Sequence, residues 1–458
     1  MLSFLRKHLT LLLAGLLLVL AWQGHWFQRW LPVDQPQEMA ILLLLGTAYL
    51  WITERLPLYV TSLLVLLLSL TWLLPSIEAA GKDASEELFY LAFFGDITLL
   101  FLGGFVLSAA LNKYGLANRL ADWMLRRTGD QPRYVLLGII LISSVLSMWM
   151  SNTATAAMMF AIMTPVIQGI PDTSAFAKAV SIAIPFACNL GGLGTPIGTP
   201  PNAIALDYLN KSGFQLGFAE WMLLSVPLML VLLFLLWLLL QRLFPAGDIV
   251  LEMEEKDDSP FSRRQYYVIA IFIFAVLGWL TSGMTGLSAG TIGLFIVILT
   301  FGSGLLATRD FRAISWDILF MLGGGLCLGV GLKASGLTAT LAGLLPLDQG
   351  FLVLLLVLLF LAAVMTTFMS NTATANLLIP IAVSLPQNPF LFSVAIAIMC
   401  SSSMAMPVST PPNAIAFGSG LIKASDMVRT GLIVTLLALA GTLLAGLYYF
   451  PILSLGQS

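Results

Sequence analysis

Long apolar runs constrain this chain more than any other feature of its sequence. Stretches such as HLTLLLAGLLLVLAW, VPLMLVLLFLLWLLL and FLVLLLVLLFLAAVM are long enough, with their flanks, to cross a hydrocarbon core about 30 Å thick. Hydrophobic residues make up 59% of the chain and charged residues 10%, whereas about a quarter of a typical soluble chain is charged. The sequence therefore predicts an all-α polytopic membrane protein. No basic stripe indicates a nucleic-acid partner.

The apolar segments fall into two halves that a charged linker separates. We count about eleven full membrane spans and two further apolar stretches that polar residues interrupt. The start of the chain resembles a signal peptide, but no small-x-small cleavage pattern follows, so we expect an uncleaved transmembrane helix. The predicted organisation is an N-terminal transmembrane segment (1–37), a first repeat (38–243), a cytoplasmic linker (244–264) and a second repeat (265–458).

Three sequence blocks occur twice, in the same order and at nearly the same separation. The hexapeptide SNTATA occurs at Ser151–Ala156 and again at Ser370–Ala375. The heptapeptide TPPNAIA begins at Thr199 and again at Thr410. A longer block, DITLLFLGGFVLSAALNKYGLANRLA, aligns with DILFMLGGGLCLGVGLKASGLTATLA. Matching blocks in matching order indicate an internal duplication.

Lys and Arg residues set the orientation of the predicted spans. We place the N-terminus in the cytoplasm and treat the interrupted stretches, 134–168 and 350–387, as re-entrant hairpins. The 21 basic residues then lie on the cytoplasmic side, except Arg29, Lys82, Lys211 and Lys333. The C-terminus faces the periplasm or the extracellular side, and each repeat holds five spans, so the two repeats are inverted. The first hairpin enters from the cytoplasm and the second from outside, and their tips would meet near the midplane.

The two hairpin tips carry polar side chains at a depth where lipid offers them no partner. Irregular backbone survives there only when it is buried in protein or lines a wet cavity. Ser, Asn and Thr supply both donors and acceptors of hydrogen bonds. The helix that begins after each tip directs free N–H groups and a positive dipole end towards the cavity. Two such ends facing one another predict a site for an anion with two separated negative groups, such as a dicarboxylate.

Two further segments, 174–213 and 391–420, contain motifs that forbid a continuous helix. NLGGLGTPIGTPPNAIA and SSSMAMPVSTPPNAIA both contain a double proline, whose residues lack the N–H and clash with the preceding helical turn. Discontinuous helices of this kind expose backbone carbonyls that can hold Na⁺. We therefore expect one cation site in each repeat, made by the hairpin tip and the broken helix of that repeat.

Other chemistries lack the residues that they need. No Asp, Glu, Lys or Arg lies in either tip or break, which argues against a proton relay. The histidines, His8 and His25, both lie near the N-terminus, which excludes a buried His dyad. The cysteines have no metal-binding spacing and are interpreted as packing residues. We interpret Asp96 and Asp317 as helix caps and the glycines that follow them as sites of close helix packing.

Paired SNT motifs, each matched with a TPPN break, resemble those of the divalent anion/sodium symporters, the INDY-type dicarboxylate transporters. The resemblance covers essentially the whole chain. It implies an elevator-type architecture, with a scaffold domain and a mobile transport domain, and a homodimer in the lipid bilayer. It also implies a substrate among the C4-dicarboxylates, citrate and sulfate.

The same resemblance assigns site residues one by one. The implied substrate contacts are Ser151, Asn152, Thr153, Ser370, Asn371, Thr372, Thr199, Thr410, Pro201 and Pro412. The implied ligands of one sodium ion are Ser147, Ser151, Asn152 and the backbone near Gly198. Those of the other are Thr366, Ser370, Asn371 and the backbone near Ser409. The duplication supports this pairing, because Ser147 and Thr366 are both hydroxyl residues four positions before an SNT motif.

We therefore predict a secondary active transporter, without enzyme activity or an organic cofactor, in the inner (plasma) membrane. It would couple at least two Na⁺ sites to the symport of C4-dicarboxylates such as succinate, malate or fumarate. A sodium-independent exchanger of dicarboxylates or tricarboxylates with the same fold is the first alternative. A channel would show a filter or a charged ring around a pore, and an intramembrane enzyme would need a nucleophile, a base or metal ligands at depth. Both are weaker alternatives.

Overall fold

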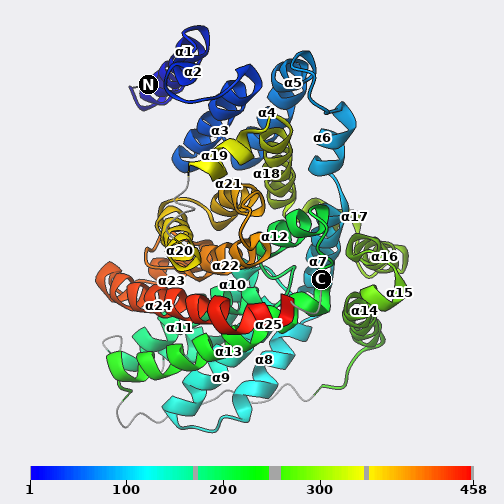
Figure 1. Cartoon of the computed structure of the whole chain (residues 1–458). Helices are drawn as coiled ribbons and strands as arrows, with labels where there is room; N and C mark the ends of the chain where they lie inside the picture. The colour runs from blue at the N-terminus through cyan, green and yellow to red at the C-terminus, as the bar shows by residue number, and fades with distance from the viewer. Residues whose placement is uncertain (1, 169–173, 247–258, 345–349, 455–458) are drawn as a thin grey trace.

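The computed structural model describes residues 2–168, 174–246, 259–344 and 350–454, and every regular element within these ranges is helical (Figure 1). Most of the predicted linker, 244–264, lies outside the described residues. Before the linker the helices are α1 (Leu2–Gln23), α2 (Trp26–Trp30), α3 (Gln35–Thr53), α4 (Leu58–Leu68), the π-helical η1 (Ser69–Leu73), α5 (Leu74–Ala79), α6 (Glu86–Phe93), α7 (Asp96–Lys113), α8 (Leu116–Arg126), α9 (Pro132–Ser147), α10 (Asn152–Gln168), α11 (Ala175–Gly191), the 3₁₀ turn η2 (Gly192–Gly194), α12 (Pro200–Lys211) and α13 (Phe218–Leu243).

The helices after the linker repeat much of this order. They are α14 (Arg263–Leu280), α15 (Ser282–Thr285), α16 (Ala289–Gly302), α17 (Thr308–Arg312), α18 (Trp316–Ala334), α19 (Leu337–Gly343), α20 (Phe351–Phe368), α21 (Asn371–Val383), α22 (Pro389–Ser402), α23 (Pro411–Gly418), α24 (Ala424–Leu444), the π-helical η4 (Ala445–Tyr449) and α25 (Phe450–Ser454). The all-α prediction is confirmed for the part of the chain that the structure describes.

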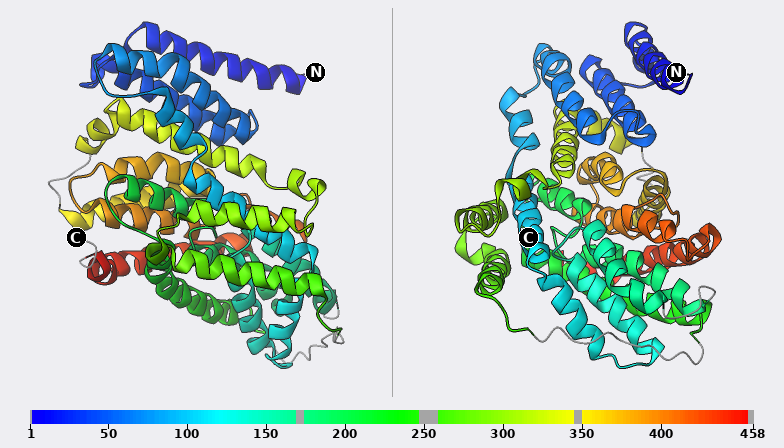
Figure 2. Two further views of the ribbon diagram at one scale, coloured as in Figure 1. Left: turned by 90° about the vertical axis from the view of Figure 1, so that its right-hand side faces the viewer. Right: turned by 180° about the vertical axis from the view of Figure 1, so that it is seen from behind.

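Eight helical segments within the described residues are long and apolar enough to cross a membrane: Leu58–Ala79, Glu86–Lys113, Ala175–Gly194, Phe218–Leu243, Arg263–Leu280, Trp316–Ala334, Phe351–Phe368 and Ala424–Ile452. The long helices run in roughly one direction, as spans of a single bilayer do (Figure 2, left). Shorter apolar helices, such as Asn152–Ile167 and Pro389–Ser402, belong to segments that breaks divide in two. The count of about eleven spans and the inverted, re-entrant topology therefore stay predictions.

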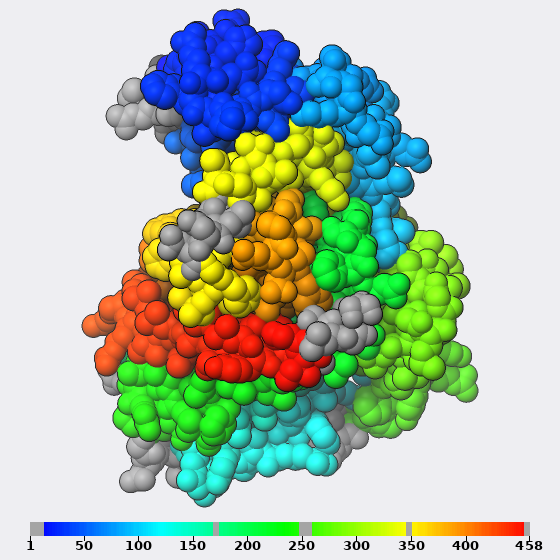
Figure 3. Space-filling model, in the orientation of Figure 1, coloured from blue at the N-terminus to red at the C-terminus, as the bar shows by residue number. Residues whose placement is uncertain are grey.

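Helices from both halves of the chain interleave around two apolar clusters. α1, α3, α4 and α5 stand together at one end of the molecule (blue in Figures 1 and 3), and α18 of the second half packs against α4. The smaller cluster joins this end through Met39, Val65, Phe89 and Leu328, which come from α3, α4, α6 and α18. The larger cluster fills the rest of the molecule and includes α9 to α13 and α20 to α24.

Glycines allow the closest helix contacts. A Cβ on Gly103 of α7 would lie 2.4 Å from the Cα of Gly293 of α16, so these two helices approach to backbone contact. A Cβ on Gly325 of α18 would lie 1.7 Å from Nδ2 of Asn376 of α21. Both glycines belong to the duplicated block that begins at Asp96 in the first repeat, and their interpretation as packing residues is confirmed.

Asp96 caps a helix, but the helix is a neighbouring one and not its own. Gly95 is the N-cap of α7, and it makes no side-chain cap. The carboxylate of Asp96 instead accepts hydrogen bonds from the N–H of Gly290 (3.1 Å) and from the hydroxyl of Ser288. A carboxylate at the start of a neighbouring helix satisfies the N–H groups that are free there, so Asp96 joins α7 to α16. Its equivalent, Asp317, lies in the first turn of α18 and faces a cavity.

Candidate functional site

Each SNT motif starts a helix after a break in the backbone. α10 and α21 both begin at the asparagine of the motif, and the preceding serine caps them. Ser151 Oγ accepts from the N–H of Ala154 (3.2 Å), and Ser370 Oγ accepts from the N–H of Ala373 (3.1 Å). Serine suits this position because its hydroxyl satisfies one of the free N–H groups at a helix start. The partial positive end of each helix consequently lies at its tip.

The asparagine of the first TPPN motif holds the break between η2 and α12 in shape. Asn202 is fully buried. Its Nδ2 lies within hydrogen-bonding distance of the carbonyl oxygens of Gly192 (2.9 Å), Leu193 (3.2 Å) and Thr195 (2.8 Å). These carbonyls lost their helical partners where the helix stops, and buried carbonyls need partners. One side chain thus stabilises a whole turn of irregular backbone.

The second TPPN motif repeats this arrangement. Nδ2 of Asn413, also fully buried, lies 3.0 Å from the carbonyl oxygens of Met404 and Met406 and 3.3 Å from the hydroxyl of Ser409. The sequence analysis gave these two asparagines no role of their own. The sequence could have predicted this role. An asparagine follows the double proline in both motifs, and its amide is the expected partner for carbonyls freed by the break.

Both tips and both breaks line one cavity of about 600 Å³. The lining residues from the tips and breaks are Ser151, Asn152, Thr153, Ala154, Ala157, Asn189, Ile197, Gly198, Thr199, Pro200, Ser370, Asn371, Thr372, Ser409, Thr410, Pro411 and Pro412. The opposite wall comes from α4, α7 and the start of α18, and comprises Leu58, Phe101, Phe105, Ser315, Asp317, Ile318 and Met321. Among these lining residues Asp317 carries the only charge, and hydroxyl and amide groups supply most of the polarity.

The cavity collects nearly all of the residues that the resemblance assigned to substrate. Pro201 is the exception, because it is buried inside α12 and the preceding Pro200 faces the cavity in its place. The backbone positions assigned to sodium, Gly198 and Ser409, also line the cavity. The hydroxyl residues assigned to sodium, Ser147 and Thr366, are fully buried behind the tips.

The first assigned cation site is a cluster of oxygen atoms around Asn152. The hydroxyl of Ser147 donates to Oδ1 of Asn152 at 2.6 Å. When the amide is turned over, Nδ2 takes that place and donates to the carbonyl oxygens of Gly198 (3.2 Å) and Cys188 (3.3 Å). In the unturned orientation Oδ1 faces the same two acceptors with no hydrogen between them. A cation among these oxygens would stabilise that orientation, so the residues fit Na⁺.

The second assigned cation site has the same construction. Thr366 Oγ1 lies 2.7 Å from Oδ1 of Asn371 and 2.9 Å from the carbonyl oxygen of Cys400, with a single hydrogen to donate. Cys400 and Cys188 occupy matching places, each with its carbonyl towards a tip. The sequence analysis treated the cysteines as packing residues and missed these carbonyls, because the residue type does not reveal where a backbone oxygen points.

Neither cluster matches a transition-metal site. Within the described residues, no group of three or more His, Cys, Asp or Glu side chains could hold a metal ion. The oxygens around Asn152 and Asn371 are neutral carbonyl, amide and hydroxyl groups, which favour hard cations.

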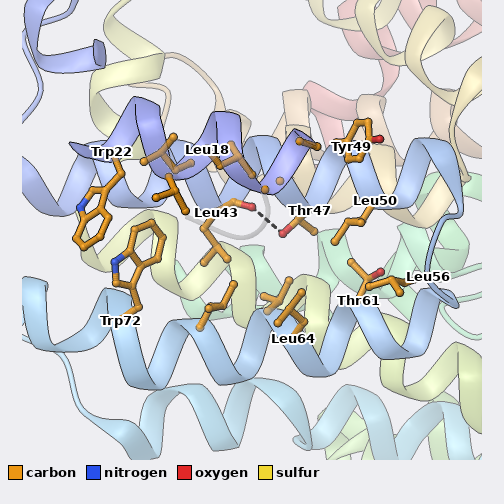
Figure 4. A pocket seen from close by; sticks show the side chains of 17 residues that line it. Leu18, Trp22, Leu43, Thr47, Tyr49, Leu50, Leu56, Thr61, Leu64 and Trp72 are labelled. Atoms are coloured by element: carbon orange, nitrogen blue, oxygen red, sulfur yellow. Dashed lines mark hydrogen bonds between the residues drawn. The ribbon is translucent and has the colours of Figure 1, made fainter. Parts of the chain in front are cut away.

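A second cavity, of about 490 Å³, lies between α1, α3 and α4 and differs in chemistry (Figure 4). Leucines, Trp22 and Trp72 dominate its wall, and no charged side chain lines it. The hydroxyl of Thr47 is already bonded to the carbonyl oxygen of Leu43 at 2.7 Å. This cavity therefore offers an anion few donors, and we place the functional site at the tips and breaks.

A family model described as "Citrate transporter" matches residues 48–399 of the chain. The chain belongs to this citrate transporter family. It is 32% identical, over 443 residues, to the sodium-dependent dicarboxylate transporter SdcS of Staphylococcus saprophyticus, a match that covers 88% of this chain and 84% of that protein. These matches confirm the resemblance to the divalent anion/sodium symporters, and they make the chain a multi-pass membrane transporter.

Two further comparisons extend over most of the chain. An uncharacterised transporter of Schizosaccharomyces pombe is 32% identical over 436 residues, which are 90% of this chain, and the chain spans only 50% of that relative. Among solved structures, the crystal structure of the Alcanivorax borkumensis YdaH transporter matches with a TM-score of 0.55 and 16% identity, over 86% of this chain and 98% of that one. At that identity the likeness concerns the fold alone.

Proposed function

We propose that the protein is a Na⁺-coupled symporter of C4-dicarboxylates such as succinate, malate or fumarate. The observation that carries the proposal is the single polar cavity that both SNT tips and both TPPN breaks line. Relatives named sodium-dependent dicarboxylate transporters support the choice of substrate and ion.

A dianion would bind between the starts of α10 and α21. Each helix start offers free N–H groups and a partial positive charge to a carboxylate. The hydroxyls of Thr153 and Thr372 line the cavity beside them and can donate further hydrogen bonds. Because no Lys or Arg lines the cavity, the anion would depend on these neutral donors and on the co-transported cations. A C4-dicarboxylate has two separated carboxylates, one for each tip.

Na⁺ would be the second substrate, bound at the oxygen clusters around Asn152 and Asn371. Two monovalent cations beside a dianion give a nearly neutral cluster without buried protein charges. Bound Na⁺ would fix the geometry of each tip, and the anion would then find its donors already in place. Coupling of this kind requires only that the anion bind better to the Na⁺-loaded tips than to the empty ones.

The transport movement would be of the elevator type. Residues 134–213 and 350–420 would form most of the moving domain, with one re-entrant hairpin from the cytoplasmic side and one from the outer side. The contact of α21 with α18 is where this domain would meet the rest of the molecule, and Gly325 of α18 leaves room there for the side chain of Asn376 of α21. The inverted repeat, a cytoplasmic N-terminus, a periplasmic or extracellular C-terminus and a homodimer in the inner membrane belong to the same proposal.

Uptake of labelled succinate into proteoliposomes tests the function. With an inward Na⁺ gradient we expect saturable uptake that exceeds the uptake in K⁺ alone. Equal uptake under both conditions, with stimulation by dicarboxylate inside the vesicles, would support the exchanger instead. Competition by unlabelled citrate, sulfate and malate ranks the anions, and saturation at low turnover would contradict a channel.

A further inference from the structure

One buried side chain links the first tip to the opposite repeat. Asn189, near the end of α11, is 1% exposed and lines the cavity. Its Nδ2 donates to the hydroxyl of Thr410 (3.1 Å) and to Oδ1 of Asn413 (3.4 Å). Its Oδ1 accepts from Nδ2 of Asn152 at 3.5 Å. Asn189 therefore connects a residue of the first cation cluster to the break of the second repeat.

The second repeat has a matching residue but no matching link. Ser401 corresponds to Asn189, because each directly follows the cysteine whose carbonyl faces a tip. Ser401 Oγ donates to the hydroxyl of Thr199 at 3.3 Å, so it also reaches the break of the other repeat. Within the described part of the chain, however, Ser401 makes no hydrogen bond to Asn371. The bonds Asn189–Thr410 and Ser401–Thr199 are equivalent bonds between the repeats, but only Asn189 is also hydrogen-bonded to a tip residue.

The amide of Asn152 meets different partners in its two possible orientations, and a cation among the oxygens would favour one of them. In the turned orientation, which satisfies the amide without a cation, Nδ2 donates to the carbonyls of Gly198 and Cys188. Oδ1 of Asn152 then faces Oδ1 of Asn189, and two acceptors meet without a hydrogen between them. In the unturned orientation Nδ2 donates to Asn189, and Oδ1 would face a Na⁺ ion among the oxygens. Occupancy of the first cluster by Na⁺ would thus determine whether Asn189 has this hydrogen bond.

We propose that Asn189 is a positioning residue that transmits Na⁺ binding at the first cluster to the anion, through Thr410. A fully paired Asn189 holds the Thr410 hydroxyl at the cavity wall. A buried amide that loses a partner is costly, so the amide and its other partners shift when Na⁺ leaves. This inference rests on the proposed symport and gives the two cation sites unequal roles. Because linkage is reciprocal, succinate raises Na⁺ affinity at the first cluster by the same factor.

The test is the Na⁺ dependence of succinate affinity in the purified protein. In the wild type, the succinate Kd falls as Na⁺ rises. In Asn189→Ser, which introduces the residue that the second repeat already carries, we expect the Kd at saturating Na⁺ to rise about tenfold and to lose most of its Na⁺ dependence. Ser401→Ala is the matched control. It raises the Kd and keeps the Na⁺ dependence, because Ser401 makes no hydrogen bond to a tip residue among the described residues.

Each outcome decides the proposal. Without succinate, the rise in the unfolding midpoint that Na⁺ causes reports that the protein is folded and binds Na⁺. We expect Asn189→Ser to retain this rise. Its loss would mean that Asn189 is needed for Na⁺ binding itself, and it would overturn the proposed transmission through Asn189. If the succinate Kd of Asn189→Ser depends on Na⁺ as in the wild type, transmission through Asn189 is overturned and the proposed symport is unaffected. Loss of that dependence in Ser401→Ala overturns the unequal roles. If the succinate Kd of the wild type does not depend on Na⁺, both the proposed symport and transmission through Asn189 are overturned. If Asn189→Ser cannot be purified, Asn189→Ala is read by the same criteria.

Discussion

At the residue scale, the asparagine of each TPPN motif takes the place of backbone hydrogen bonds that are lost where the preceding helix stops. Asn202→Ala would leave the carbonyls of Gly192, Leu193 and Thr195 without their partner. Unsatisfied buried groups cost about 1–3 kcal/mol each, so we expect a lower unfolding midpoint together with loss of transport. Thermal unfolding in detergent measures this, and the exposed Asn112→Ala serves as control. An unchanged midpoint in Asn202→Ala would contradict the structural role.

The tips make a different prediction at the same scale. Asn152→Ala and Asn371→Ala each remove an amide that faces both an oxygen cluster and the cavity. We expect either change to abolish succinate uptake while the oligomeric state on size-exclusion chromatography stays that of the wild type. Thr153→Ala and Thr372→Ala remove only a hydroxyl of the cavity wall, so they should weaken succinate binding more than Na⁺ binding. Normal succinate uptake in Asn152→Ala or Asn371→Ala would contradict the assignment of these residues to the site.

At the element scale, the break between α11 and α12 depends on two glycines that touch. A Cβ on Gly198 would lie 2.4 Å from the carbonyl oxygen of Gly192, and a Cβ on Gly192 would lie 2.9 Å from Oδ1 of Asn152. Gly198→Ala therefore has to separate Gly198 from Gly192 and so distort the break. Overpacking costs about 1–3 kcal/mol, and the carbonyl of Gly198 would leave its cluster.

The measurement is the Na⁺ concentration that gives half-maximal uptake, which we expect to rise about tenfold or more in Gly198→Ala. Gly302→Ala is a matched control, because a Cβ there meets nothing within 4 Å. If Gly198→Ala changed only the succinate KM and left the Na⁺ dependence alone, the carbonyl of Gly198 would not belong to the first cation site.

At the scale of the whole molecule, the sequence predicts the site better than the contacts that assemble it. The polar SNT and TPPN motifs inside apolar runs can be recognised in the sequence. Their duplication in matching order indicates that two tips and two breaks share one cavity. The carbonyls of Cys188 and Cys400 could not be predicted, because every residue carries a carbonyl. The bond from Asn189 to Thr410 and the bond from Asp96 to the start of α16 both depend on how distant segments pack, which no local pattern records.

The proposed movement of the whole molecule has its own test at the contact between α18 and α21. A Cβ on Gly325 would lie 1.7 Å from Nδ2 of Asn376, whose amide is buried without a hydrogen-bond partner among the described residues. Gly325→Ala therefore forces α21 and α18 apart at a point outside the cavity, because neither Gly325 nor Asn376 lines it. We expect the maximal uptake rate to fall about tenfold while the succinate Kd stays within about twofold, because the change acts between the domains.

Adding Asn376→Ala to this variant removes the colliding amide. The double variant should recover most of the rate, because the two substitutions act on one contact and are not additive. Gly343→Ala, at a glycine with open space around it, is the control and should transport normally. An equal loss of affinity and rate in Gly325→Ala, or a double variant as slow as the single one, would show that this contact does not lie on a sliding interface and would remove the support it gives to an elevator movement.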